Sequence, residues 1–195
     1  MKNKQTKISY SIVKGFFLEL LDHYDLMNDT DVKEKLDRYT SQVNNQINYE
    51  TPSRIVIDKK CRVLLPDYSA KEVVMPYLAK TLFLFFLSHP EGLEFRKMCK
   101  HKEDLYTIYQ IVSEAKNTEA VRIKRSIENL VKPRNNRIYE ECSHVRRAFQ
   151  EIGVSAEQIE HYCISGQHGG VRRISIDRNL IEVKNEKLKS HFKNN

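Results

Sequence analysis

The stretch that decides the fold lies in the last third of the chain, RIYEECSHVRRAFQ at residues 137–150 and YCISGQHGGVRRISI at residues 162–176. In the first stretch, apolar residues recur at helical spacing, which predicts an amphipathic helix over 137–152. Its buried stripe is expected to consist of Ile138, Cys142, Val145, Phe149 and Ile152. The remaining faces are polar, so this helix is expected to present arginines to solvent.

The second stretch has the pattern of a β-hairpin. Its apolar positions are Tyr162, Ile164, Val171, Ile174 and Ile176. Between the two arms stands Gly166-Gln167-His168-Gly169-Gly170, and glycine tolerates the positive φ angles that tight turns need. The sequence therefore predicts a basic hairpin directly after the amphipathic helix.

Upstream of these elements the pattern predicts a mixture of short strands and helices. Three short β signals at 53–58, 62–65 and 72–75 alternate apolar and polar residues, as in a small antiparallel sheet with one wet face. Residues 77–88 are apolar nearly all round, which is typical of a buried central helix. A short strand at 93–95 and helices at 102–114 and 119–131 are expected to follow. The fold class is therefore α+β.

The N-terminal region has the pattern of a helical hairpin. Residues 8–25 predict one helix, and Thr30 or Asp31 is able to cap a second. The second helix has a narrow apolar seam made of Val32, Leu36, Tyr39 and Val43. This spacing is typical of helix-on-helix packing, either on the first helix or in a homodimer. The expected organisation is a helical hairpin at 1–50, a globular domain at 53–182 and a frayed polar tail at 183–195.

The positive charge of the chain is concentrated in its second half. The formal net charge is +7, and nine of the 13 arginines lie between Arg122 and Arg178. Residues 121–178 carry 11 Lys and Arg against seven Asp and Glu, whereas residues 1–50 carry seven against eight. A basic surface attracts polyanions. The segment that contains the predicted arginine-bearing helix is thus the segment with the excess charge.

Several classes of protein are disfavoured by what the sequence lacks. No apolar run is long enough to cross a bilayer, and the N-terminus does not have the pattern of a signal peptide. The four cysteines are widely spaced and are expected to be reduced thiols, which indicates a cytoplasmic protein without a membrane partner. The cysteines and histidines form no cluster with metal-ligand spacing, so we expect neither a metal nor a cofactor.

The sequence gives no reason to expect catalysis. Neither of the glycine-rich phosphate loops, GxxxxGK[ST] and GxGxxG, occurs. Cys163 lies near His161 and His168, but no orienting Asp or Asn has a convincing position for a thiol nucleophile. We therefore predict no catalytic residues and no enzymatic activity.

The order of the predicted elements resembles the winged-helix effector domains of OmpR/PhoB-type regulators. Residues 54–65 match their N-terminal sheet and 78–92 match the first core helix and its turn. Residues 138–149 match the recognition helix, and 164–176 match the wing. The stretches LFLFFLSHPEGLEF and NNRIYEECSHVRRAF also look like a group of uncharacterised bacterial proteins with the same layout. The likeness covers residues 53–182, but residues 1–50 are too short for a receiver domain and the insert between Gly92 and Ile138 is long.

This resemblance implies a DNA-binding transcriptional regulator. The helix that begins at Arg137 would enter the major groove, where Arg146 or Arg147 pairs with guanine and Ser143 and His144 make smaller contacts. The phosphate contacts would come from Lys132, Arg134, Arg172 and Arg173. His168 at the hairpin tip would reach the minor groove. The alternative is a winged-helix protein–protein interaction module without DNA binding, which a weak dependence of binding on salt would indicate.

Overall fold

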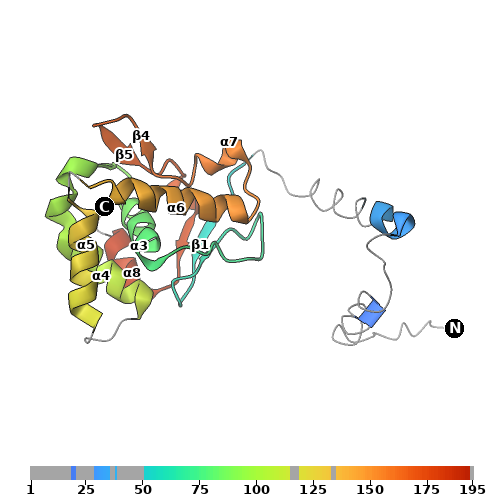
Figure 1. Ribbon diagram of the computed structural model, residues 1–195, viewed down its shortest axis with the longest axis horizontal. Coiled ribbons are helices and arrows are strands. Elements are labelled where there is room, and N and C mark those ends of the chain that lie inside the picture. The colour runs from blue at the N-terminus through green and yellow to red at the C-terminus, as the bar shows by residue number, and fades with distance from the viewer. Residues whose placement is uncertain are drawn as a thin grey trace. The chain divides into compact units, whose positions relative to one another are not determined.

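The structure is a computed structural model, shown in Figure 1, and it describes residues 19–20, 29–35, 38, 51–114, 119–132 and 135–193. The chain divides into two compact units, 1–48 and 49–195. In the first unit, residues 19–20, 30–35 and 38 are helical. Asp29 Oδ1 accepts hydrogen bonds from the N–H groups of Asp31 at 2.9 Å and Val32 at 3.1 Å. Asp29 is therefore the N-cap, and the prediction of Thr30 or Asp31 in that role was wrong.

The predicted dimer seam lies mostly outside the described residues. Of its four members only Val32 is described, and its side chain is partly exposed. Leu36, Tyr39 and Val43 are outside the described residues, as is most of the predicted helix 8–25. The helical hairpin and its homodimer interface therefore stay predictions.

The centre of the second unit is helix α3 (Tyr77–Leu87), in which ten of 11 residues are buried. An almost entirely apolar helix avoids water only when other elements cover it on all sides. Helices α4 (Lys102–Ser113) and α6 (Arg137–Glu151) pack against it. The rings of Phe83 in α3 and Phe149 in α6 lie 5.5 Å apart between their centres. Helix α5 (Ala120–Leu130) completes this group by packing on α4 and α6.

The apolar periodicity of these four helices matches the structure closely. The predicted helices at 77–88, 102–114, 119–131 and 137–152 are confirmed within one residue at most ends. In α6, Ile138, Val145 and Phe149 are buried as expected. Cys142 and Ile152 are only partly buried, and Glu141 and Ala148 are buried in addition to the expected residues.

The first sheet differs from the predicted N-terminal antiparallel sheet. Strand β1 (Ile55–Ile57) pairs antiparallel with β2 (Val63–Leu64), as expected. The third strand, however, is β6 (Ile181–Val183), which pairs parallel with β1 and comes from the other end of the domain. The expected third strand at 72–75 is reduced to one antiparallel bridge between Glu72 and Leu64.

The C-terminal segment is folded as far as residue 193, where the described part ends, so the prediction of a frayed polar tail at 183–195 was wrong there. After β6, helix α8 (Glu186–Lys193) packs on α4 and β6. Leu188 is its fully buried anchor. The segment is bound by main-chain pairing to β1, including a 2.7 Å hydrogen bond from the Lys184 N–H to the Ile57 carbonyl. Such pairing is made by backbone groups, so the polar side chains of this segment did not predict it.

The second sheet contains the predicted hairpin. Its strand order is β3 (Leu93–Glu94), β5 (Val171–Arg173), β4 (Ser165–Gly166), and both pairings are antiparallel. The turn is closed by a 3.1 Å hydrogen bond from the Gly170 N–H to the Gln167 carbonyl, and Gly169 has a φ of +74°. The glycine prediction is thus confirmed at Gly169. Val171, expected to be buried, is half-exposed.

Short helical segments connect these elements. A 3₁₀ helix, η1 (Phe95–His101), joins β3 to α4, and α7 (Ala156–Ile159) lies between α6 and β4. A second 3₁₀ turn, η3 (Arg178–Leu180), precedes β6. In Figure 1 the β4–β5 hairpin lies above α6, with α7 at the far end of that helix.

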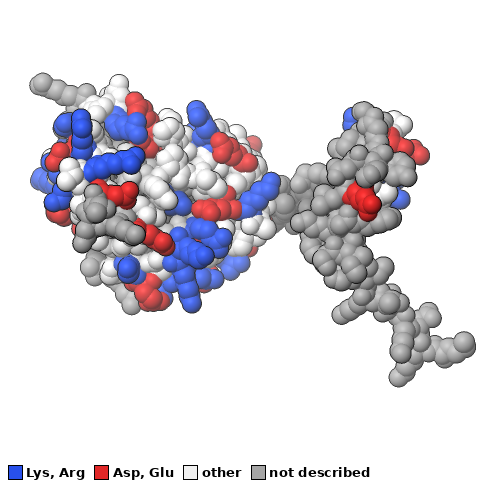
Figure 2. All heavy atoms as spheres, turned by 60° about the horizontal axis from the view of Figure 1, so that its bottom comes forward, with Lys and Arg blue, Asp and Glu red and all other residues white. Residues whose placement is uncertain are grey.

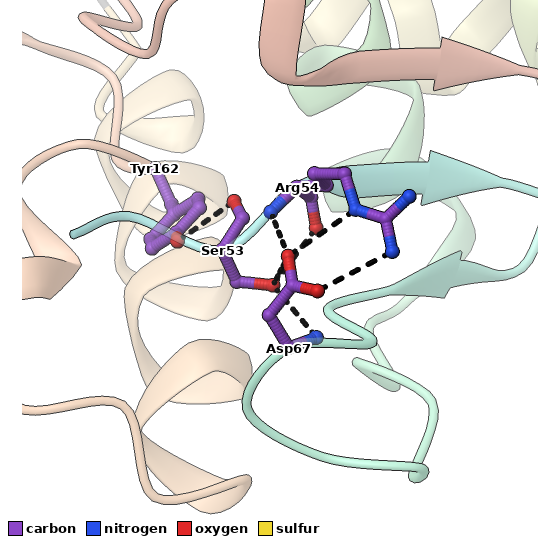
Figure 3. A network of polar contacts seen from close by, with 4 residues as sticks. All are labelled: Ser53, Arg54, Asp67 and Tyr162. Atoms are coloured by element: carbon purple, nitrogen blue, oxygen red, sulfur yellow. Dashed lines mark hydrogen bonds and ion pairs between the residues drawn. The ribbon is translucent and has the colours of Figure 1, made fainter. Parts of the chain in front are cut away.

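A polar network attaches the start of the second unit to its core (Figure 3). The Tyr162 hydroxyl donates a 3.1 Å hydrogen bond to the Ser53 carbonyl. Asp67 accepts hydrogen bonds from the backbone N–H of Arg54 at 2.9 Å and from its guanidinium at 3.3 Å. These bonds, the backbone one foremost, hold the pKa of Asp67 below its ordinary value although partial burial opposes them. The network fixes the entry of β1 beside Tyr162, whose ring stacks on Phe149 at 5.1 Å.

Candidate nucleic-acid interface

The first arginine of α6 holds a buried carboxylate. Glu141 is fully buried, and the Arg137 guanidinium lies 2.6 Å from its Oε1 and 2.9 Å from Oε2 of Glu140. His144 Nδ1 lies 3.1 Å from the other oxygen of Glu141. Oε1 makes no well-directed hydrogen bond within the described residues, so the ion pair with Arg137 is its main compensation. Arg137 therefore neutralises an internal charge, and His144 lies within hydrogen-bond distance of the same carboxylate.

The second arginine of α6 is also paired. Arg146 lies 2.6 Å from Oε1 of Glu160, which directly follows α7. This hydrogen bond is the main reason why the pKa of Arg146 is raised further. Arg147 is exposed and has no ion pair with any described residue, and Ser143 donates to the Tyr139 carbonyl of its own helix. The outward side of α6 thus carries one unneutralised arginine.

The two arginines of the hairpin lie on opposite faces of β5, as successive residues of a strand do. The guanidinium carbon of Arg172 lies 4.9 Å from the ring centre of Phe95 and 5.6 Å from that of Tyr139. Arg173 is exposed. Cation–π contacts hold a guanidinium in place without neutralising it. Arg172 is therefore fixed beside α6, whereas Arg173 faces away from that contact.

A hollow of about 120 Å³ separates the start of α6 from the hairpin tip. It is called the α6–hairpin hollow below. Its lining comes from three stretches that are distant in sequence, 95–96, 130–139 and 168–172. The polar and aromatic side chains among them are Phe95, Arg96, Lys132, Asn135, Tyr139, His168 and Arg172. Among the described residues that line it, none is Asp or Glu. The fold thus gathers three of the sequence-predicted residues, Lys132, His168 and Arg172, around one cavity.

The cations of the hollow are only partly compensated. Arg96 pairs with Glu94, outside the lining. The Lys132 ammonium donates a 3.1 Å hydrogen bond to the neutral Asn129 side chain. The Arg172 guanidinium makes no hydrogen bond or ion pair with any other described residue, and the imidazole of His168 lies beside these cations. The result is an excess of positive charge in a concave site.

The other predicted residues do not join this cluster. Arg137, His144 and Arg146 are engaged with carboxylates, and Arg134 lies outside the described residues. Arg96 is the functional candidate that the sequence analysis missed. It follows β3 without any motif, and only the pairing of β3 with β5 brings it to the hairpin. No local pattern in the sequence predicts that approach.

Two of the thiols, those of Cys142 and Cys163, show no sign of activation. Burial raises the pKa of Cys142 to about 12 and that of Cys163 to about 11. A thiol with such a pKa is almost entirely protonated at neutral pH and is a poor nucleophile. In the part of the chain that the structure describes, no group of three His, Cys, Asp or Glu side chains is arranged to hold a metal ion.

On the face drawn in Figure 2 the two signs of charge are mixed. Figure 2 shows a face of the protein on which basic and acidic side chains are interspersed over the second unit, with one group of adjoining Lys and Arg. A second, wider hollow of about 480 Å³ is lined by lysines and also by the acids Glu114 and Glu186. Its opposing charges make it a weaker candidate for an anion than the α6–hairpin hollow.

Comparison with known proteins adds no relative to this picture. No protein-family model matches the sequence, and neither characterised proteins nor solved structures give a significant match. Among the described residues, no helix is long and apolar enough to cross a bilayer. The functional argument therefore rests on the geometry and charge of the site.

Proposed function

We propose that the protein binds duplex DNA through α6 and the β4–β5 hairpin, as a winged-helix regulator of transcription. The order α3, β3, α4–α5, α6, β4, β5 and the strand order β3-β5-β4 support a winged-helix arrangement. The observation that carries the proposal is the α6–hairpin hollow. It brings Arg172 of the hairpin together with Lys132, which precedes α6, and Arg96, which follows β3, and no carboxylate lines it among the described residues.

In this proposal the exposed side of α6 enters the major groove. Arg147 is its unneutralised arginine and would donate to guanine O6 and N7, with Ser143 as a smaller contact. Lys132 and Arg172 would hold backbone phosphates on either side of the start of α6. Arg146 contributes little, because Glu160 already occupies its guanidinium.

The test is the binding of a fluorescently labelled duplex to the full chain, followed by anisotropy over a salt series. Each phosphate contact adds about 0.9 to the slope of log affinity against log salt. The double variant Lys132→Gln/Arg172→Gln should therefore lower that slope by about two and weaken binding at every duplex sequence.

The matched control is Lys60→Gln/Lys71→Gln, which removes the same charge from two exposed lysines outside the site. This control should bind DNA like the wild type. Absence of binding at low salt, or an equal loss in both double variants, would reject the proposed interface. Tight association with a protein that hardly changes with salt, without DNA binding, would indicate an interaction module instead.

A further inference from the structure

We propose that the α6–hairpin hollow is a receptor site for a phosphomonoester group, and that its occupancy competes with DNA. The competition rests on the proposed DNA binding, whereas the phosphomonoester site itself stands on the geometry of the hollow. The group in question is a terminal phosphate, carried by a small molecule such as a nucleotide or by the end of a nucleic-acid strand.

The size of the hollow is the first argument. Its volume is about 120 Å³, and a water molecule occupies about 30 Å³ in the liquid. The hollow thus has room for roughly four waters, which suits one small polyatomic anion. A whole DNA duplex or an α-helix is far too large to enter it.

The second argument is the direction of the charges. Lys132 approaches from the segment after α5 and Arg172 from β5. Arg96 of η1 adds a third cation, which it shares with Glu94. An internal phosphodiester has one negative charge and two free oxygens. A terminal phosphate carries about −1.5 to −2 charges at pH 7 and presents three acceptor oxygens. Cations placed on several sides are better matched to the terminal group.

The third argument is the state of Arg172. Phe95 and Tyr139 hold its guanidinium by ring contacts, and these leave its N–H groups without a hydrogen-bond acceptor among the described residues. A guanidinium fork binds phosphate oxygens in pairs, and little side-chain entropy is lost when it is already positioned. His168 and the backbone of Gly169 and Gly170 close the hollow at the hairpin tip.

The test is isothermal titration calorimetry of the full chain with inorganic phosphate, adenosine 5′-monophosphate and adenosine. Phosphate and the nucleotide should bind, and adenosine should not. Lys132→Gln, which changes one exposed side chain, and Lys132→Gln/Arg172→Gln should each weaken phosphate binding at least about tenfold, equivalent to 1.4 kcal/mol. The control Lys60→Gln/Lys71→Gln should bind like the wild type. Amide NMR shifts at His168, Gly169 and Gly170 report the location.

Absence of phosphate binding, or binding that is equal in all variants, would overturn the site whether or not the protein binds DNA. A duplex with 5′-phosphates that binds at least tenfold more tightly than the 5′-hydroxyl duplex identifies the strand end as the source. If the two duplexes bind with equal affinity and the nucleotide still binds, the natural ligand is a free phosphomonoester. To test the competition, inorganic phosphate and chloride are compared at equal ionic strength. If phosphate displaces a 5′-hydroxyl duplex more than chloride does, the competition is supported. Equal displacement by the two salts rejects it.

Discussion

Arg137 and Arg146 of α6 are paired with carboxylates, whereas Arg172 at the α6–hairpin hollow is not. On α6, Arg137 and Arg146 lie 2.6 Å from carboxylate oxygens of Glu141 and Glu160. In the hollow, Arg172 lies against two aromatic rings and Lys132 against a neutral amide. An arginine that already has a carboxylate partner offers little to a phosphate. The number of arginines in a segment is therefore a poorer guide to an anion site than the number that remain unneutralised.

The largest expected effect tests whether Arg137 is structural. Arg137→Ala leaves the fully buried Glu141 without its closest cation, which should cost about 3 kcal/mol of unfolding free energy. Arg147→Ala, on the exposed side of the same helix, should change stability by less than about 0.5 kcal/mol. Urea denaturation of both variants measures the difference. Equal stabilities of the two variants would mean that Glu141 does not need Arg137.

A second prediction concerns Arg54, another arginine held by a carboxylate. Asp67→Asn should cost about 1 kcal/mol at neutral pH, because the half-exposed network loses its charge-assisted hydrogen bonds. The folded-state pKa of Asp67 lies below its unfolded value. This contribution is therefore present above about pH 4 and is lost as the pH falls through the folded pKa.

The measurement for this second prediction is denaturation of the wild type and Asp67→Asn between neutral pH and pH 3. The gap between the two proteins should narrow as the pH falls. A gap that is constant across that range would assign the effect to packing and not to the charge of Asp67.

The smallest effect is expected when Arg146 is released from its partner. Glu160→Gln should change stability by less than about 0.5 kcal/mol, since the pair is half-exposed. If DNA binds as proposed, the freed guanidinium should raise the salt slope by up to about one. Glu157→Gln, on the adjacent α7, changes the net charge equally without freeing a described arginine partner and serves as the control. Anisotropy titrations in which the two variants agree would show that Arg146 is remote from the DNA.

The helices of the core were predictable because they depend on local periodicity. Leu105, Ile108 and Val112 of α4, like Ile123 and Ile127 of α5, recur at the spacing that places them on one face. The β signals at 55–57 and 63–64 and the glycine turn at Gly169 were predictable for the same reason. Each is a property of a few consecutive residues.

The partners of these elements were less predictable. The parallel pairing of β1 with β6 joins residues more than 120 positions apart, and it turned a segment predicted to be a frayed tail into a strand and a helix. The candidate site shows the same division. Lys132, His168 and Arg172 were expected from their basic or hairpin context, whereas Arg96 was missed.

From the sequence alone follow the four core helices, the position of the apolar centre and the accumulation of positive charge in the second half of the chain. These properties follow from composition and from spacing along the chain. Which cations have no carboxylate partner, and can therefore pair with a ligand, depends on the tertiary structure. Burial of Glu141, the approach of Glu160 to Arg146 and the pairing of β3 with β5 are all long-range or packing-dependent events. Electrostatic interactions act through space, so the state of an arginine depends on neighbours that the linear sequence does not reveal.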